Sequence, residues 1–278
     1  MALTFLNKLT NLQQRFVIGL PGAAAIVFLI CYSEWTYFFL FFTICFFALK
    51  EFYNLIQQAG IKPNKVFGIA SGMLIFTLLY FLEKKVLPIN YYYLLFPFIF
   101  LIFIIELFKS NQKPFVNIAF AFLGNIYIAL PFALMNVSAF INGLYDFSII
   151  LGILILLWSN DVGGYFFGKY LGKNPLFPRV SPKKTWEGAI GGALFSCAMS
   201  LLLHYWFSTT LDIVHWVGLS IIISVAGSYG DLVESMLKRS LDLKDSAQSI
   251  PGHGGFLDRF DGLLLASPFV AAYLKLLL

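Results

Sequence analysis

Long apolar segments with almost no charge recur along the whole chain. A helix needs about 20 mostly apolar residues to cross a bilayer, and nine segments approach that length. Hydrophobic residues are 59% of the 278 residues and charged residues 12%, against about 25% charged residues in an ordinary soluble domain. A soluble fold could not bury so much apolar surface, so the sequence predicts an all-α polytopic membrane protein with about nine transmembrane helices. The predicted spans are approximately 16–33, 35–49, 66–82, 91–108, 115–136, 147–167, 188–207, 213–230 and 262–278.

Lysine and arginine residues are unevenly divided between the two sides of this arrangement. With the N-terminus inside, all 19 except Lys84, Lys85 and Lys275 fall on the inner side. Positive charge favours the cytoplasmic side of a membrane. We therefore expect an integral membrane protein with an uncleaved first span and the N-terminus in the cytoplasm.

Acidic residues gather in two connections on this same side, 159–188 and 228–262. These connections hold more than half of the 14 acidic residues. The two regions are far apart in sequence but face one compartment. We expect them to form a single polar site at the cytoplasmic ends of the C-terminal helices. The acidic residues are Asp161, Glu187, Asp231, Glu234, Asp242, Asp245, Asp258 and Asp261.

Region 228–262 places one aspartate directly after a span, Asp231, and another directly before the next, Asp258. Carboxylates at membrane depth are costly unless they are paired, and oxygen-only ligands suit Mg²⁺ together with substrate phosphates. A helix cap at Asp231 and an ion pair of Asp258 with Arg259 or Lys238 are an equal alternative. Glu234 and Lys238 stand four residues apart on a continuing helix, where they form a favourable pair.

Region 159–188 has a local excess of positive charge after Asp161. Ser181 followed by Pro182 resembles a helix N-cap with proline at the first position, which would put Lys183 and Lys184 in the first helical turn. Cations in the first turn interact unfavourably with the helix dipole. An anion bound at the helix start would make them favourable, because the backbone N–H groups and both lysines would attract it. The segment therefore favours a phosphate-bearing ligand, although these charges could also serve only the membrane topology.

Residues 235–261, SMLKRSLDLKDSAQSIPGHGGFLDRFD, resemble the signature of the phosphatidate cytidylyltransferase (CDP-diacylglycerol synthase) family. The upstream segment SPKKTWEG, residues 181–188, is similar to a second family segment. The sequence after Asp161 departs mildly from the family pattern, with Val162 and Leu171 at unexpected positions. The matching positions are Ser235, Lys238, Arg239, Lys244, Asp245, His253, Gly254, Gly255, Asp258, Arg259 and Asp261.

The resemblance implies transfer of CMP from CTP to phosphatidate, giving CDP-diacylglycerol and pyrophosphate, with Mg²⁺ required and a second cation left open. It implies N-terminal membrane helices at 1–146 and a C-terminal catalytic region at 147–278. It also implies that Asp231 and Asp258 hold the metal and that Asp261 supports them. Phosphates would be held by Lys238, Arg239, Arg259, Lys183 and Lys184. The remaining substrate-binding positions would be Asp161, Ser181, Thr185, Lys244, Asp245, His253, Gly254 and Gly255.

The expected partners are CTP, phosphatidate and the lipid bilayer, with a homodimer as a further implication and no nucleic acid. A CTP-dependent kinase of a membrane alcohol is one alternative, which would release CDP instead of pyrophosphate. A transporter is another, but it should place ionisable residues near the middle of the membrane. Only Glu106 is a candidate for that role, and it lies near the end of its span.

Overall fold

The computed structural model describes residues 11–109, 112–141, 143–208, 210–241 and 255–277. In this part of the chain, helices dominate, and the only strands form two short antiparallel pairs. The elements are α2 (Asn11–Tyr32), α3 (Glu34–Gln58), α4 (Lys65–Glu83), η1 (Ile89–Leu94), α5 (Leu95–Leu107), α6 (Pro114–Gly124), η2 (Asn125–Ala129), α7 (Leu130–Ala139), β1 (Phe140–Ile141), β2 (Leu144–Tyr145), α8 (Phe147–Leu171), β3 (Pro175–Phe177), β4 (Ser181–Thr185), α9 (Trp186–Trp206), α10 (Ile213–Ser240) and α11 (Leu257–Leu277).

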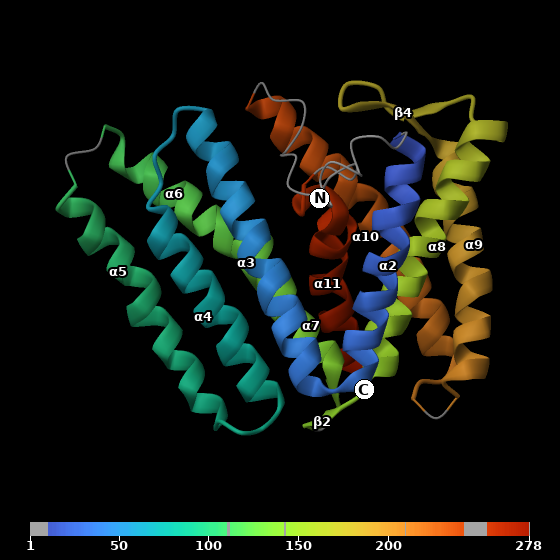
Figure 1. The fold of residues 1–278 in the computed structure, drawn as a ribbon, viewed down its shortest axis with the longest axis horizontal. Helices are drawn as coiled ribbons and strands as arrows, with labels where there is room; N and C mark the ends of the chain where they lie inside the picture. Colours follow the sequence, from blue (N-terminus) through green and yellow to red (C-terminus); the bar gives the residue numbers. More distant parts are fainter. Residues whose placement is uncertain (1–10, 110–111, 142, 209, 242–254, 278) are drawn as a thin grey trace.

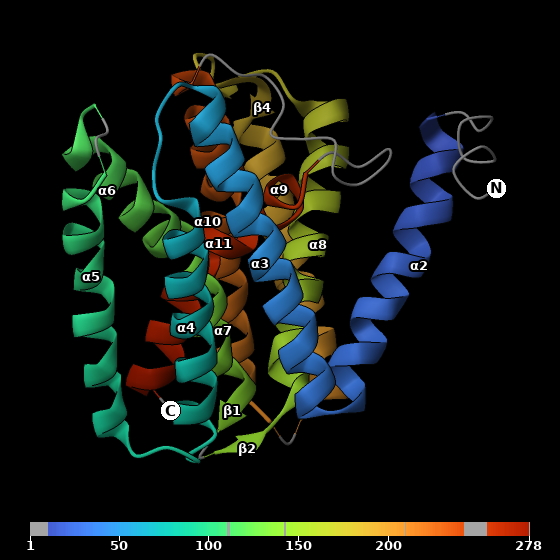
Figure 2. The same ribbon diagram turned by 60° about the vertical axis from the view of Figure 1, so that its left-hand side comes forward.

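Eight helical stretches of the described chain are long and apolar enough to cross a membrane, which confirms an all-α polytopic protein. The first predicted span coincides with α2, whose described apolar part, Gly19–Tyr32, is shorter than the others. The helices lie roughly side by side, and Figure 2 shows α2 diverging from the others toward its N-terminal end. About nine spans are therefore consistent with eight long helices and this shorter one.

The boundary between α2 and α3 is a capping box. The Ser33 side chain accepts a hydrogen bond from the Thr36 N–H at 3.2 Å, and the Thr36 side chain accepts from the Ser33 N–H at 3.1 Å. Both groups thus satisfy N–H donors that a helix start leaves unpaired. The second predicted span, 35–49, ends too early, because α3 continues through Lys50 and Glu51 to Gln58.

The fifth predicted span is interrupted by a π-helical turn, η2, between α6 and α7. Pro131 has no N–H to donate to the carbonyl one turn earlier, and the Leu130 N–H instead reaches back five residues to the Asn125 carbonyl. The chain stays helical through this turn, so one continuous stretch from Pro114 to Ala139 is long enough to span.

The last four helices are packed closely by glycines. A Cβ atom at Gly192 on α9 would lie 2.6 Å from the Asn160 carbonyl oxygen on α8. Only glycine allows this approach of two helix backbones without a shift. The short distance between α8 and α9 brings the residues at their ends into one site.

The segment between α8 and α9 is a β3–β4 hairpin, which corrects the expected helix start at Ser181. Lys183 and Lys184 lie in β4, and α9 begins at Trp186 with Thr185 as its N-cap, whose side chain accepts from the Gly188 N–H at 3.2 Å. Strand pairing of Pro175 with Thr185 holds the segment extended. The argument for an anion at a helix start near Ser181 therefore fails, although both lysines remain beside the helix ends.

The hairpin, the C-terminal end of α10 and the N-terminal end of α11 lie at the same end of the bundle (Figure 1). The three lysines assigned to the other side lie near the opposite end. Lys84 pairs with Glu34 at the start of α3, at 2.6 Å, and Lys275 pairs with Glu83 at the end of α4, at 2.8 Å. The charge asymmetry in the sequence thus corresponds to a separation in space.

Candidate active site

A cavity of about 1640 Å³ lies between the C-terminal helices and α2 and α3. Its charged lining comes from α8, β4, α10 and α11, segments that are widely separated in sequence. This confirms that regions 159–188 and 228–262 converge. The charged residues that line it are Asp161, Lys169, Lys183, Lys184, Asp231, Glu234, Lys238, Asp258, Arg259 and Asp261.

Lys184 joins the hairpin to α10. Its Nζ lies 2.7 Å from the Asp231 carboxylate and donates to the Ser228 carbonyl oxygen at 3.1 Å. Lys183, the neighbouring residue, is exposed and also lines the cavity. Successive residues on a strand point to opposite sides. Lys184 points toward α10, so the Lys183 side chain points away from it, and the two lysines do not share one partner.

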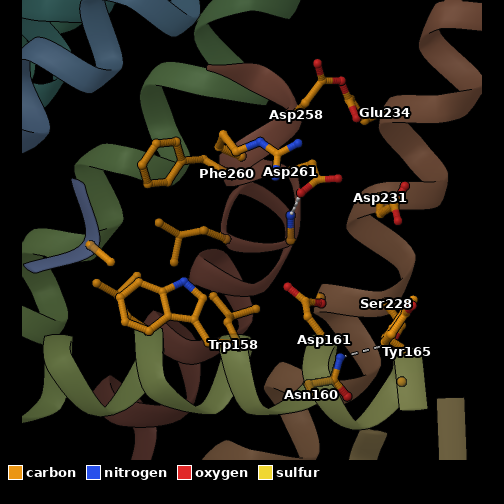
Figure 3. A pocket seen from close by; sticks show the side chains of 18 of the residues that line it. Trp158, Asn160, Asp161, Tyr165, Ser228, Asp231, Glu234, Asp258, Phe260 and Asp261 are labelled. Carbon is orange, nitrogen blue, oxygen red and sulfur yellow. Dashed lines mark hydrogen bonds between the residues drawn. The ribbon is translucent and has the colours of Figure 1, made fainter. Parts of the chain in front are cut away.

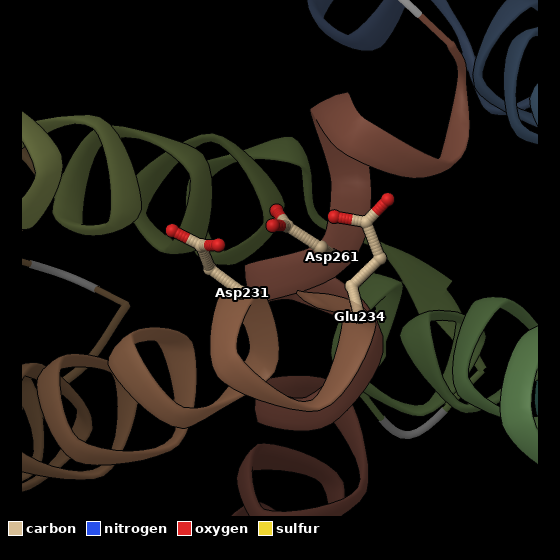
Figure 4. Close-up of side chains that lie close together, drawn as sticks. All are labelled: Asp231, Glu234 and Asp261. Atoms are coloured by element: carbon tan, nitrogen blue, oxygen red, sulfur yellow. The ribbon is translucent and has the colours of Figure 1, made fainter. Parts of the chain in front are cut away.

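Three carboxylates from α10 and α11 form an acidic cluster, which consists of Asp231, Glu234 and Asp261. One oxygen from each lies within 4.8 Å of the others, and Figure 4 shows them converging from the two helices. Asp231 and Glu234 are three residues apart and share a helix face. Oxygen-only donors at this spacing fit a hard divalent cation such as Mg²⁺.

Lys238 connects this acidic cluster to the start of α11. Its Nζ lies 3.2 Å from the Glu234 carboxylate and 2.8 Å from that of Asp258. The Asp258 carboxylate also accepts a hydrogen bond from the Gly255 N–H at 2.9 Å. The predicted Glu234–Lys238 pair is confirmed. The structure brings Asp258 to Lys238 and brings Asp231 to Glu234 and Asp261, so metal binding by Asp258 stays a prediction.

Asp161, near the C-terminal part of α8, faces the same space as Asp231 and Asp261 (Figure 3). The neighbouring Asn160 side chain donates to the Ser228 hydroxyl at 3.4 Å and thereby links α8 to α10. The isolated aspartate that follows an apolar run thus lines the same cavity as Asp231 and Asp261, and its part in substrate binding stays a prediction.

The remaining residues that the sequence predicted for substrate binding do not all line the cavity. Thr185 lines the cavity and caps α9. Ser181 and Arg239 are described but do not line the cavity. The Gly255 N–H is held by Asp258. Lys244, Asp245, His253 and Gly254 lie outside the described residues.

Two acidic residues near this site were not among the predicted metal-ligating or substrate-binding residues. Glu234 was expected in the polar site and in a pair with Lys238, but it was not named as a metal ligand, although its spacing of three from Asp231 was visible. Glu51, on α3, is buried at 4% exposure, and its carboxylate accepts hydrogen bonds from the N–H groups of Phe256 and Leu257. A carboxylate within an apolar span, as in FFALKEFYNLI, is the signal that would have found it.

Below its charged end, the cavity continues along apolar side chains. These come from α2, α3 and α8, three helices that are largely apolar in sequence. A single cavity therefore offers charged groups at one end and an apolar surface beside them. The apolar residues include Ile26, Leu29, Phe39, Leu40, Ile44 and Leu154.

Comparison with known proteins agrees with this geometry. The cytidylyltransferase family matches residues 13–277. A phosphatidate cytidylyltransferase of Bacillus subtilis (strain 168) is 30% identical over 285 residues, covering 96% of this chain and 99% of the relative. Proteins of the same name from Staphylococcus aureus (strain COL) and Haemophilus influenzae (strain Rd) are each 36% identical, covering 58% and 59% of this chain and 61% and 58% of the relatives. The chain therefore belongs to the cytidylyltransferase family, as the motif at residues 235–261 predicted.

Proposed function

We propose that this protein is a Mg²⁺-dependent phosphatidate cytidylyltransferase of the bacterial inner membrane. It transfers CMP from CTP to phosphatidate and releases pyrophosphate. The observation that carries the proposal is the cavity, in which a charged cluster adjoins an apolar surface. One substrate is a water-soluble polyanion and the other an anionic lipid, and this cavity offers matching surfaces to both. The names of the relatives support the same assignment.

The charged end of the cavity suits phosphate groups. Lys184, Lys238 and Arg259 line it together with the acidic cluster. Two polyanions repel each other, and fixed positive charge that offsets this repulsion is a main source of catalysis in phosphoryl chemistry. Lys183 and Lys169 add positive charge at the rim. The acyl chains of phosphatidate would lie along the apolar residues of α2 and α3.

Asp231, Glu234 and Asp261 would hold Mg²⁺, and we keep Asp258 as a further candidate ligand. The fit rests on their donor chemistry, since carboxylate oxygens within 4.8 Å of one another are what Mg²⁺ prefers beside substrate phosphates. A bound Mg²⁺ would neutralise the triphosphate and favour departure of pyrophosphate.

The reaction needs no strong general base. The phosphate of phosphatidate is already an anion, so one of its oxygens attacks the α-phosphorus of CTP directly. A new P–O bond forms there as the bond to the β-phosphate bridging oxygen breaks, and that oxygen leaves with pyrophosphate. The protein orients the two phosphates and compensates their charge, for which Lys184, Lys238 and Arg259 are suitably placed.

We assign the charged end to the cytoplasmic side, where CTP is available. The support is the positive-inside distribution of lysine and arginine, together with the location of Lys84 and Lys275 near the opposite end. A homodimer and the division into regions 1–146 and 147–278 remain proposals from the family resemblance.

The test is incubation of the purified protein with labelled CTP, phosphatidate and Mg²⁺, followed by identification of the products. Labelled CDP-diacylglycerol and an equal amount of pyrophosphate are expected. Release of CDP with a phosphorylated lipid alcohol would instead identify the kinase alternative. Substitution of diacylglycerol for phosphatidate is the matched control, because it lacks the attacking phosphate, and it should give no cytidylylated lipid.

A further inference from the structure

The start of α11 is held by a carboxylate from a distant helix. The two side-chain oxygens of Glu51 on α3 accept hydrogen bonds from the backbone N–H groups of Phe256 and Leu257, at 2.9 and 3.3 Å. α11 begins at Leu257, so these are donors that a helix start leaves without intrahelical partners. Glu51 therefore caps α11 from another helix, across more than 200 residues of sequence.

A second contact from the same face of α3 strengthens this capping. The Phe47 ring, four residues before Glu51, stacks on the Phe256 ring with centroids 5.1 Å apart and planes 13° apart. Residues four apart lie on one face of a helix. α3 therefore contacts Phe256 in two ways, through the Phe47 ring and through the Glu51 carboxylate.

The burial of these groups makes the hydrogen bonds important. Glu51 is 4% exposed and Leu257 is fully buried. A buried N–H that loses its acceptor carries the full cost of its desolvation, and a carboxylate is further stabilised at the positive end of a helix dipole. The first turn of α11 is therefore fixed to α3 and not only to its neighbour in sequence.

This first turn carries residues of the proposed active site. Asp258 directly follows Leu257 and accepts from Lys238 at 2.8 Å. Asp261, one turn later, belongs to the acidic cluster. Glu51 does not line the cavity, so any influence on the reaction acts through α11.

We propose that Glu51 is a positioning residue for the cytidylyl transfer. By capping α11, it sets the distance of Asp258 from Lys238 and of Asp261 from Asp231 and Glu234. This inference rests on the proposed function and gives the N-terminal half of the chain a part in the site.

The experiment compares Glu51→Gln and Glu51→Ala with the wild type as full-length purified protein. Glu106→Gln is the matched control, because Glu106 is also a buried glutamate, at 2% exposure, and accepts from the Asn117 side chain on the neighbouring helix. Three quantities are measured: amide hydrogen exchange of the peptide containing Phe256 and Leu257, kcat, and the Mg²⁺ concentration for half-maximal activity.

Glu51→Gln keeps one acceptor oxygen, and Glu51→Ala keeps none. We expect faster exchange at Phe256 and Leu257 in both variants, with a fall in kcat of about tenfold for Gln and about 100-fold for Ala. The Mg²⁺ requirement should rise several-fold in the same order. Glu106→Gln should stay within about twofold of the wild type in all three quantities.

Unchanged exchange at Phe256 and Leu257 in Glu51→Ala would overturn the proposal. So would a normal kcat and Mg²⁺ requirement, or an equal loss in Glu106→Gln, because the effect would then be general destabilisation. If the wild type itself makes no cytidylylated lipid, the proposed function fails. The exchange measurement would still decide whether Glu51 caps α11.

Discussion

The Nζ atom of Lys184 lies 2.7 Å from the carboxylate of Asp231 and joins the β3–β4 hairpin to α10. This contact links the two polar regions that are separated in sequence by the whole of α9. It also places a positive charge directly beside the acidic cluster. The cavity therefore combines positive charge, which attracts anionic phosphates, with carboxylates that are suited to binding a cation.

Replacement of Lys184 by alanine should impair CTP use more than replacement of Lys183. Both variants lose one positive charge, but only Lys184 is held against Asp231. We expect kcat/KM for CTP to fall about 10- to 100-fold in Lys184→Ala, since bonds to charged groups contribute about 1.5–3 kcal/mol. Steady-state kinetics at saturating phosphatidate measure this. Lys275→Ala is the control, because Lys275 pairs with Glu83 outside the site. An unchanged kcat/KM in Lys184→Ala would show that Lys184 does not bind CTP and contributes only to the membrane topology.

Asp258→Asn should abolish turnover while the protein remains folded. The amide oxygen can still accept from the Gly255 N–H, but Lys238 loses the nearer of its two charged partners and keeps only Glu234, and the site loses a candidate metal ligand. We expect kcat to fall about 100-fold or more, with little change in the unfolding temperature in detergent. Asp212→Asn, an exposed aspartate before α10, should behave as the wild type. Near-normal activity of the purified Asp258→Asn protein would contradict the role assigned to Asp258.

Removal of divalent cations should stop product formation, and Mg²⁺ should restore it. Glu234→Gln should need a higher Mg²⁺ concentration, because it removes one anionic donor from the acidic cluster. Loss of groups around a metal typically costs 10- to 100-fold in affinity. A Mg²⁺ titration of activity measures the change, with Glu83→Gln as a glutamate control outside the site. Full activity in excess chelator would exclude the metal assignment.

Gly230→Ala should destabilise the packing of α10 on α11. A Cβ atom at residue 230 would lie 2.4 Å from the Asp261 carbonyl oxygen and 2.8 Å from Gly262 Cα, so the backbone must shift. Overpacking of this kind costs about 1–3 kcal/mol, which thermal unfolding in detergent would detect. A Cβ atom at Gly22 would meet nothing within 4 Å, so Gly22→Ala should not lower the unfolding temperature. Equal stability of the two variants would show that the helices can separate without cost.

Much of the architecture could be predicted from local composition. Hydropathy identifies spans because a helix must satisfy its own backbone and match the bilayer thickness. The eight long apolar helices in the described part of the chain agree with this. The charge pattern separated Lys84 and Lys275 from the other basic residues. The predicted helix start near Ser181 was wrong because residues 181–185 pair with β3 as a strand. The helix can therefore begin only after Thr185, which is its N-cap.

The sequence by itself determined that the chain spans a membrane, that its charges gather in two late regions, and that the motif at 235–261 matches one family. Each of these is a property of residues that are close together in the chain. Only the tertiary structure decided that Lys184 contacts Asp231, that Glu234 joins Asp261, and that Glu51 caps α11. These contacts depend on the distances between packed helices, and side chains far apart along the chain give no local signal of such distances.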